Sequence, residues 1–421
     1  MILTPDRKNS SIYIIALIMP FWAFVNALRN VNLPHSKNVI WLFVIFYGLN
    51  FTPSIREDDA DGLRRIEHYE LYTSDRFMNW DKFLQKFNGP VEDSYTDFME
   101  PLLMYFSSKV SSDFHFLFGL YGLIGGYFFS RIIDLLVRLS NFKYDKYILP
   151  YFTAALLFVP FWHIQGFRFW LATIYFLWCI LKYFETRKII FLLLTLFTLT
   201  IHFSYTFGII MIVFFAFVPK NNLLPFYLMY FVSLLISNID VLSIGNFIGQ
   251  FSSGYEYKVQ GYAGEAYKEV VNELSQFESN WYVDFREIGI KLITNTFILI
   301  SFFYYRKKIS LSSHKEILIL SLIMLSLTNV VSNVPSMGRF YTPSYFILFY
   351  FILVAFKWKI IDSFLKKMHF LFMPILFIYS LVELRIGCDN FPISNFFTNW
   401  FLIPFYTPVS TIIDNIKDLI L

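Results

Sequence analysis

The stretch that decides this fold is Phe161-Trp162-His163-Ile164-Gln165-Gly166-Phe167-Arg168-Phe169-Trp170, which separates two long apolar runs. Each run carries no acid or base until its far end, so we expect His163, Gln165 and Arg168 to be held at one boundary of a membrane. An ionisable group at this depth is costly, and arginine cannot lose its proton to escape the cost. The pattern therefore predicts a partner that is anionic or rich in hydrogen-bond acceptors.

The composition outside this stretch is that of a membrane protein. Of the 421 residues, 56% are hydrophobic and 21% aromatic, while only 16% are charged; a soluble domain carries about 25% charged residues. Apolar runs of roughly 15 to 20 residues recur over the whole length, as bilayer-spanning helices require. The sequence predicts an all-α polytopic fold, with residues 1–421 forming one membrane domain of about 11 to 13 transmembrane helices.

Twelve apolar runs are the individual candidates for these spans. The first of them lacks a small-residue cleavage site, so we expect a retained span and not a removed signal. The predicted spans are Ser11–Leu28, Val39–Phe51, Phe114–Ile133, Tyr147–Trp162, Phe169–Tyr183, Ile189–Ile201, Tyr205–Val218, Leu223–Ile239, Ile288–Tyr304, Ile317–Val331, Tyr341–Phe356 and Phe370–Val382.

The distribution of Lys and Arg in the short connections gives an orientation, because cytoplasmic connections are enriched in these residues. One set of connections holds 18 of them, and the opposite set holds only Arg168, Arg339 and Arg385. We therefore expect the opposite set to face outward, together with two long acidic and aromatic loops at about 55–113 and 240–287. This orientation depends on a helix break at His202-Phe203-Ser204; one continuous helix over Ile189–Val218 would invert everything after it.

Four outward arginines are candidates for binding an anion: Arg168, Arg339, Arg56 and Arg286. The planar guanidinium suits phosphate, and a diphosphate can engage two such groups, so we expect an outward-opening cavity that binds a lipid diphosphate. The ordinary alternative is an arginine that reaches the lipid headgroups, and we favour it for Arg56 or Arg286 taken alone. Arg168 and Arg339 are lone bases in short outer turns, where the orientation rule disfavours any base, so we favour function there.

Histidines and acids on the same side supply the remaining candidates. His202 and His163 could act as a general base or position a sugar hydroxyl; the alternative is a structural histidine bound to a backbone carbonyl. Asp58, Asp59 and Asp61 could bind a divalent cation, but the run lacks the spacing of a calcium loop. No metal-ligand or Walker motif is present in the sequence, and Cys179 and Cys388 are too far apart to suggest a disulfide framework.

Several short motifs, taken in order, resemble the EpsG family, relatives of the Wzy polymerases of O-antigen and capsule synthesis. Two spans are followed by an outer segment with Arg56, Asp61 and Tyr69, then by Glu100-Pro101. Later come Gly166-Phe167-Arg168, Ile201-His202-Phe203-Ser204 and Gly338-Arg339-Phe340-Tyr341. The order covers nearly the whole chain, although Phe169-Trp170 stands where smaller residues are expected.

The resemblance implies a polysaccharide polymerase of the bacterial inner membrane with a GT-C-like helical fold, working without a metal or other cofactor. Its substrates would be undecaprenyl-diphosphate-linked oligosaccharides in the lipid bilayer, and its partners a chain-length regulator and a flippase; no nucleic acid is expected. Arg168 and Arg339 would stabilise the diphosphate leaving group, and His202 would act on the acceptor hydroxyl. Arg56, Asp61, His163, Gln165, Arg286 and Tyr341 are the expected substrate-binding residues.

Three other functions stay open. One is a structural membrane subunit of a synthase complex, which the long outer loops and the placed arginines disfavour. An O-antigen ligase would share the donor and the fold type. A flippase or exporter of the same lipid-linked sugars should place charge at mid-span positions along its path, whereas here the middles of the predicted spans are nearly free of charge. That distribution favours chemistry at one face over passage across the membrane.

Overall fold

The computed structural model describes residues 5–53, 61–74, 79–88, 97–236, 281–332, 336–405 and 410–420. Within these ranges the regular structure is helical, and extended backbone pairs only in an isolated bridge between Pro392 and Thr411. The all-α class is therefore confirmed for the described residues. The GT-C-like topology stays a prediction.

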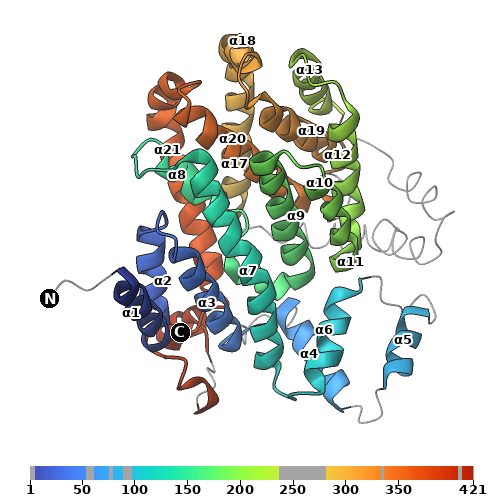
Figure 1. The fold of residues 1–421 in the computed structure, drawn as a ribbon, viewed down its shortest axis with the longest axis vertical. Helices are drawn as coiled ribbons and strands as arrows, with labels where there is room; N and C mark the ends of the chain where they lie inside the picture. The colour runs from blue at the N-terminus through green and yellow to red at the C-terminus, as the bar shows by residue number, and fades with distance from the viewer. Residues whose placement is uncertain are drawn as a thin grey trace.

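The first half of the fold precedes and includes the stretch 161–170 (Figure 1). Its helices are α1 (Pro5–Ile18), α2 (Pro20–Arg29), α3 (Ser36–Leu49), α4 (Asp61–Ser74), α5 (Trp80–Asn88), α6 (Met99–Ser108), α7 (Phe114–Ser140), α8 (Leu149–Leu157), the 3-10 turn η1 (Phe161–Gly166) and α9 (Phe167–Thr186).

The second half completes the bundle. Its helices are α10 (Ile190–Leu194), η2 (Thr195–Phe197), α11 (Thr198–Ile201), η3 (Phe203–Tyr205), α12 (Thr206–Phe217), α13 (Leu224–Ser233), α17 (Trp281–Ile300), the π-helical turn η4 (Ser301–Tyr305), α18 (Arg306–Ser310), α19 (Lys315–Val331), η5 (Met337–Phe340), α20 (Tyr341–Lys357), α21 (Asp362–Gly387), η6 (Ile393–Phe396), η7 (Ile403–Phe405) and α22 (Ile412–Ile420).

Five helical runs among the described residues are long and apolar enough to cross a membrane. They are Phe114–Ser140, Leu149–Thr186, Trp281–Ser310, Met337–Lys357 and Ser363–Gly387. Four shorter apolar helices accompany them: Ser36–Leu49, Ile190–Ile201, Phe203–Phe217 and Leu224–Ser233. A multi-pass membrane protein is thus supported, whereas the larger number of spans expected from the sequence stays a prediction.

Local sequence explains where the helices break. Pro20 cannot donate a backbone hydrogen bond, and the predicted span Ser11–Leu28 is divided there into α1 and α2. The run Leu149–Thr186 is likewise divided, because α8 ends before Pro160 and α9 begins only after η1. His202 has an extended backbone (φ −153°, ψ 115°), so the expected break between α11 and α12 is confirmed.

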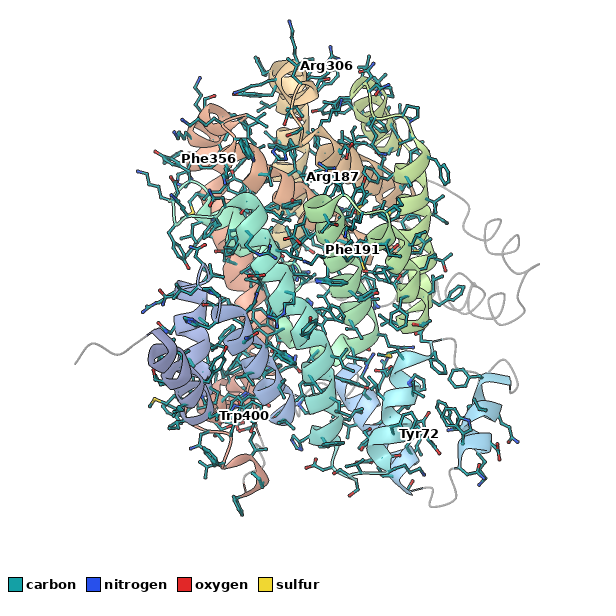
Figure 2. All side chains as sticks on the ribbon, in the orientation of Figure 1. Tyr72, Arg187, Phe191, Arg306, Phe356 and Trp400 are labelled. Carbon is teal, nitrogen blue, oxygen red and sulfur yellow. The ribbon has the colours of Figure 1, made fainter. Side chains whose placement is uncertain are left out.

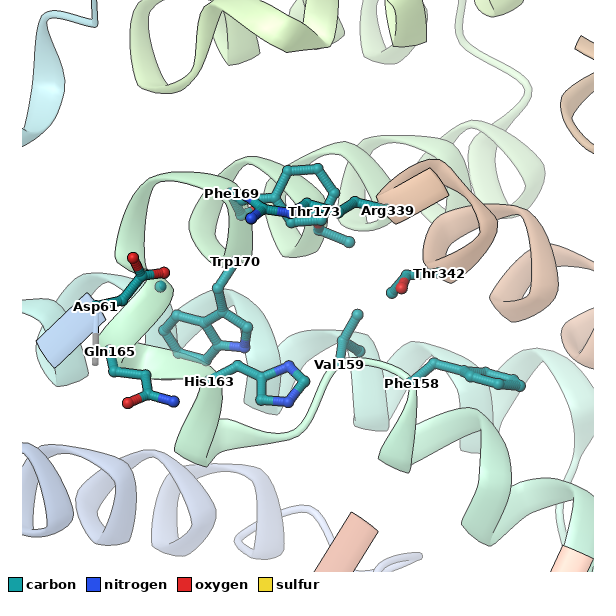
Figure 3. A pocket seen from close by; sticks show the side chains of 11 residues that line it. Asp61, Phe158, Val159, His163, Gln165, Phe169, Trp170, Thr173, Arg339 and Thr342 are labelled. Carbon is teal, nitrogen blue, oxygen red and sulfur yellow. Dashed lines mark hydrogen bonds between the residues drawn. The ribbon is translucent and has the colours of Figure 1, made fainter. Parts of the chain in front are cut away.

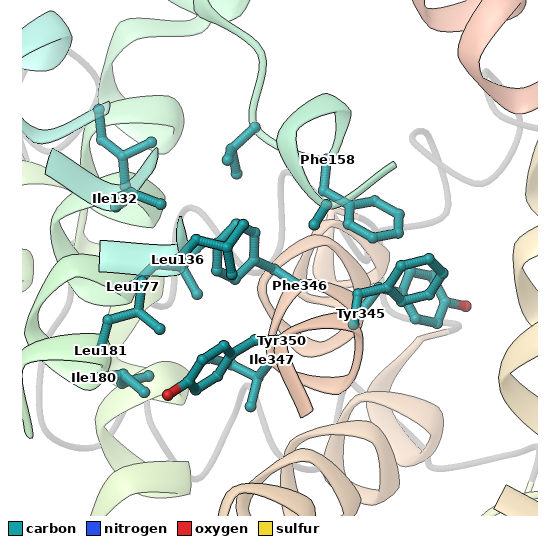
Figure 4. Close-up of a cluster of buried hydrophobic side chains, with 14 of the residues drawn as sticks. Ile132, Leu136, Phe158, Leu177, Ile180, Leu181, Tyr345, Phe346, Ile347 and Tyr350 are labelled. Atoms are coloured by element: carbon teal, nitrogen blue, oxygen red, sulfur yellow. The ribbon is translucent and has the colours of Figure 1, made fainter. Parts of the chain in front are cut away.

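The centre of the bundle is formed by α7, α8, α9 and α20 (Figure 4). Ile132 and Leu136 of α7, Leu177 of α9, and Phe346 and Ile347 of α20 are each fully buried. α20 is buried on almost every face, whereas α17 and α21 expose most of theirs. The stretch 161–170 therefore begins the helix α9 that belongs to the packed centre.

Two glycines allow α3 and α7 to approach closely. A Cβ atom at Gly48 would lie 2.2 Å from the Phe118 carbonyl oxygen, and one at Gly122 would lie 2.5 Å from the Val44 carbonyl oxygen. No side chain fits at those distances, so small residues are required, as at many membrane helix interfaces.

The two ends of the bundle differ in the chain segments that they gather. Arg187 and Arg306 lie toward one end, and Tyr72 and Trp400 lie at the other (Figure 2). At that second end the described parts of the predicted loop 55–113 are largely helical and form α4, α5 and α6. The second predicted loop is described only from residue 281, where α17 already begins.

Candidate active site

A pocket of about 270 Å³ lies against the stretch 161–170 (Figure 3). Its walls come from the start of α4, the end of α8, η1, the first turns of α9, η5 and the start of α20. Its lining residues are Asp61, Phe158, Val159, His163, Gln165, Gly166, Phe169, Trp170, Thr173, Arg339 and Thr342. Four of the residues expected from the sequence therefore meet in one cavity: Asp61, His163, Gln165 and Arg339.

Arg339 is the cation of this pocket. It is exposed, and its guanidinium carbon lies 6.0 Å from the centre of the Phe169 ring. Within the described residues we find no ion pair of Arg339 with a carboxylate. An arginine in this state keeps its hydrogen-bond donors available for an anion that enters the pocket.

Asp61 brings a carboxylate to the same pocket. It is the first residue of α4, and its side chain is 52% exposed. Asp61 and Gln165 lie at one end of the pocket, and Phe158 and Thr342 lie toward the other (Figure 3). The cavity therefore combines an open cation with a carboxylate and an amide, groups that can bind an anion and hydroxyls together.

Arg168 lies in a different environment, although Phe169 beside it lines the pocket. Its Nη1 atom donates to Asp97 Oδ2 at 2.9 Å, and its Nε atom lies 3.1 Å from Glu100 Oε2. The Arg168 side chain is 41% exposed, whereas Asp97 is only 3% exposed. Arg168 thus neutralises two buried acids that precede and begin α6.

His202 shares Asp97 with Arg168. Its Nδ1 atom lies 3.0 Å from Asp97 Oδ2, and the Phe203 backbone N–H donates to Asp97 Oδ1 at 2.8 Å. The Phe98 N–H also donates to the Thr200 carbonyl at 3.0 Å. Residues 97–98 therefore satisfy backbone groups that the helix break at His202 sets free.

Glu100 is the second buried acid of this network. Its Oε1 atom accepts from Arg65 Nε at 2.6 Å and from the Tyr121 hydroxyl at 3.3 Å. Arg65 also donates to the Asp61 carbonyl at 2.9 Å, which ties the network to the α4 residue that lines the pocket. The network and the pocket are thus adjacent parts of one site.

Asp97 stays ionised at any ordinary pH. Burial acts to raise the pKa of its carboxyl group, but the hydrogen bond and charge of His202, the charge of Arg168 and the Phe203 N–H outweigh burial and lower the pKa to about 2. Asp97 is therefore a permanent hydrogen-bond acceptor in this site.

The remaining expected residues lie outside the pocket lining. Arg286 pairs with the buried Glu383 of α21, at 3.1 Å. The Tyr341 hydroxyl donates to Asn329 Oδ1 at 2.9 Å, on the side of α20 that faces α19. Arg56 lies outside the described residues, so its predicted role is not placed.

Sequence reasoning missed Asp97 and the pairing of Glu100. Both belong to an acidic segment that offers 13 carboxylates between residues 55 and 113, and no spacing distinguishes these two. The only sequence signal is the order Glu100-Pro101 within the family-like pattern. Within the described residues no group of three or more His, Cys, Asp or Glu side chains could hold a metal ion; Asp58 and Asp59 lie outside them.

A larger apolar groove of about 610 Å³ opens on the other side of η1. It runs between α2, α7, α8 and α21. Each of these helices lines it with apolar side chains, for example Phe24, Phe129, Phe152 and Leu384, respectively. Trp162 lines this groove, while the next residue, His163, lines the polar pocket. A single turn of the chain therefore borders both an apolar and a polar cavity.

We find no protein-family model, curated protein or solved structure that matches this chain at a significant level.

Proposed function

We propose that the chain is a membrane glycosyltransferase that joins undecaprenyl-diphosphate-linked oligosaccharide repeat units into a surface polysaccharide, on the outer face of the bacterial inner membrane. The observation that carries this proposal is Arg339, which lines the pocket with Asp61, His163 and Gln165 and makes no ion pair among the described residues. An open cation beside hydroxyl-binding groups suits a ligand that joins a phosphate to a sugar.

The proposed reaction needs charge stabilisation at the leaving group. The acceptor hydroxyl oxygen forms a bond to the anomeric carbon of the donor, and the bond from that carbon to the diphosphate oxygen breaks. The diphosphate leaves with the bonding electron pair, and the hydroxyl proton passes to a base. Arg339 would hold the diphosphate and stabilise its growing charge, which is the interaction that lowers such a barrier.

The apolar groove supports a substrate that carries a long hydrocarbon chain. Because Trp162 lines the groove and His163 lines the pocket, a lipid-linked sugar diphosphate could place its isoprenoid chain in the first and its head in the second. Because lipid tails are as apolar as the groove, the groove would orient the isoprenoid chain and would contribute little hydrophobic free energy. A soluble sugar nucleotide has no hydrocarbon chain that could occupy the groove.

The test uses cells that lack the chain and the purified protein together. We expect the deletion to leave surface glycans of a single repeat, seen as the loss of the polymer ladder on a gel. Purified protein in lipid nanodiscs should restore the ladder from the lipid-linked repeat extracted from those cells. Loss of all attached glycan would indicate a ligase instead, and absence of outward-facing repeats would indicate a flippase.

A further inference from the structure

The carboxylate of Asp97 determines which nitrogen of His202 carries a proton. Asp97 Oδ2 lies 3.0 Å from His202 Nδ1, and an ionised carboxylate can only accept a hydrogen bond. Since Asp97 is buried against Arg168 and keeps its charge, the proton of this bond belongs to Nδ1. In the neutral imidazole the lone pair is then on Nε2.

The geometry leaves Nε2 available for a substrate. The His202 side chain is 21% exposed, and we find no hydrogen bond from Nε2 to any described residue. The imidazole ring is nearly perpendicular to the ring of Phe169, with the two ring centres 6.0 Å apart. His202 does not itself line the pocket, but both His202 and Arg339 contact the ring of Phe169, which does line it.

We propose that Asp97 is the positioning residue of this site: it holds His202 as the tautomer whose Nε2 accepts the proton of the acceptor hydroxyl. This inference rests on the proposed function. As the sugar oxygen bonds to the anomeric carbon, its proton moves to Nε2, and the resulting imidazolium ion is stabilised by the Asp97 carboxylate until it releases the proton to water. Asp97 touches no substrate and acts only through His202.

Two other contacts of Asp97 hold its carboxylate in one orientation. Oδ1 is occupied by the Phe203 N–H, so the carboxylate cannot rotate freely, and Arg168 Nη1 shares Oδ2 with the imidazole. An amide at position 97 cannot accept from all three donors. With its NH₂ group at the Oδ2 position it would face Arg168 Nη1 and His202 Nδ1–H, and with its NH₂ group at the Oδ1 position it would face the Phe203 N–H. In either orientation the variant loses the charge that stabilises the imidazolium ion.

The charged groups around His202 come from four elements. Asp97 and Glu100 approach with α6, Arg168 with α9, Asp61 and Arg65 with α4, and Arg339 across the Phe169 ring from η5. Among these, only Asp97 is within hydrogen-bond distance of the imidazole. The change Glu100→Gln is therefore a matched control, because it removes a second buried carboxylate that contacts Arg168 but not His202.

The first test is kinetic and uses nanodisc-embedded protein with the lipid-linked repeat extracted from cells lacking the chain. We expect Asp97→Asn to lower kcat by on the order of 10² to 10⁴ with little change in KM, the usual range for losing a general base. The acidic limb of its pH–rate profile should move to lower pH, because the imidazolium loses its counter-charge. Glu100→Gln should leave that limb in place. If Asp97→Asn and Glu100→Gln give the same profile, the positioning role is wrong.

The second test does not depend on activity. In protein labelled with ¹⁵N-histidine, the His202 signals are identified by their loss in His202→Gln. We expect a protonated Nδ1 and an unprotonated Nε2 in the otherwise unchanged chain, and a mixture of the two tautomers in Asp97→Ala, which has no side-chain acceptor. An unprotonated Nδ1 in the unchanged chain would overturn the inference even if Asp97→Ala does not fold. A chain with the expected tautomer but without polymerase activity would instead overturn the proposed function alone.

Discussion

The turn that carries Arg168 and the turn that carries Arg339 are equivalent in the sequence and different in the structure. Each is a short connection with one base, placed just before a long apolar helix. Arg168 is held by the buried acids Asp97 and Glu100, whereas Arg339 lies over an aromatic ring in an open pocket. A local sequence pattern is therefore enough to place an arginine just before an apolar helix. Residues far away in the chain determine whether that arginine is a counter-ion or is available to bind a ligand.

The largest effect that tests this difference is on stability. Arg168→Ala leaves Asp97 and Glu100 buried without one of their cations, and breaking such a pair costs about 3 kcal/mol, the low end of the range because Arg168 is partly exposed. We expect a clear fall in the denaturation temperature of the protein in detergent. Asp97→Asn in the same chain should recover part of the loss. An unchanged denaturation temperature in Arg168→Ala would mean that the two turns are alike after all.

Arg339→Ala should affect the reaction and not the fold. The variant loses no ion pair of the described residues, so its denaturation temperature should stay near that of the unchanged protein. The proposed polymerisation should slow on the order of a hundredfold, because the proposed diphosphate ligand would lose a charge-assisted contact. The rate is measured on the lipid-linked repeat at matched protein level. Arg385→Ala is the control, since Arg385 is the third arginine of the connections expected to face outward, is 42% exposed and pairs with Asp389 one turn away. Equal rates in both variants would remove Arg339 from the site.

Much of the fold could be predicted from the sequence because its signals are local. The length of the apolar runs predicts the helices. Pro160 precedes the 3-10 turn η1 and Gly166 ends it, and a helix breaks at His202. These features depend on residues close together in the chain. The helix break at Pro20 is equally local, yet the predicted span Ser11–Leu28 ran through it.

The network around Arg168 could not be predicted in the same way. Asp97 lies 71 residues before Arg168 and 105 before His202, in a segment where many acids look alike. Its selection depends on how α6 packs beside α9 and α11, which no short pattern encodes. For the same reason the sequence grouped Arg286 and Tyr341 with the pocket, although the structure pairs them with Glu383 and Asn329.

Low pH should lower the stability of the protein through Asp97, beside Arg168, by less than the substitution of Arg168 does. The pKa of Asp97 is lowered to about 2, so its ionised form contributes stability above the ordinary aspartate pKa, and this contribution is lost as the pH falls from about 4 through about 2. We expect roughly 2 kcal/mol of stability to disappear over that interval. Denaturation of the unchanged protein and of Asp97→Asn at stepped pH isolates this carboxyl group, and Arg339→Ala should follow the unchanged protein. Identical slopes for the unchanged protein and Asp97→Asn would contradict the lowered pKa.

Exchange of arginine for lysine gives the smallest effect and the sharpest contrast. Arg339→Lys keeps a cation near Phe169 but loses the planar group that can donate two parallel hydrogen bonds to a phosphate. We expect roughly tenfold slower polymerisation, as for the loss of one hydrogen bond to a charged group, and no change in stability.

Arg168→Lys should act in the opposite sense and lower stability. One ammonium group cannot reach both Asp97 Oδ2 and Glu100 Oε2 as the guanidinium does. Rates and denaturation temperatures of both lysine variants, measured on the same preparations, form a two-by-two comparison. If Arg339→Lys lost stability and kept its rate, the pocket arginine would be a structural counter-ion, and Arg168 would become the better candidate for binding the diphosphate.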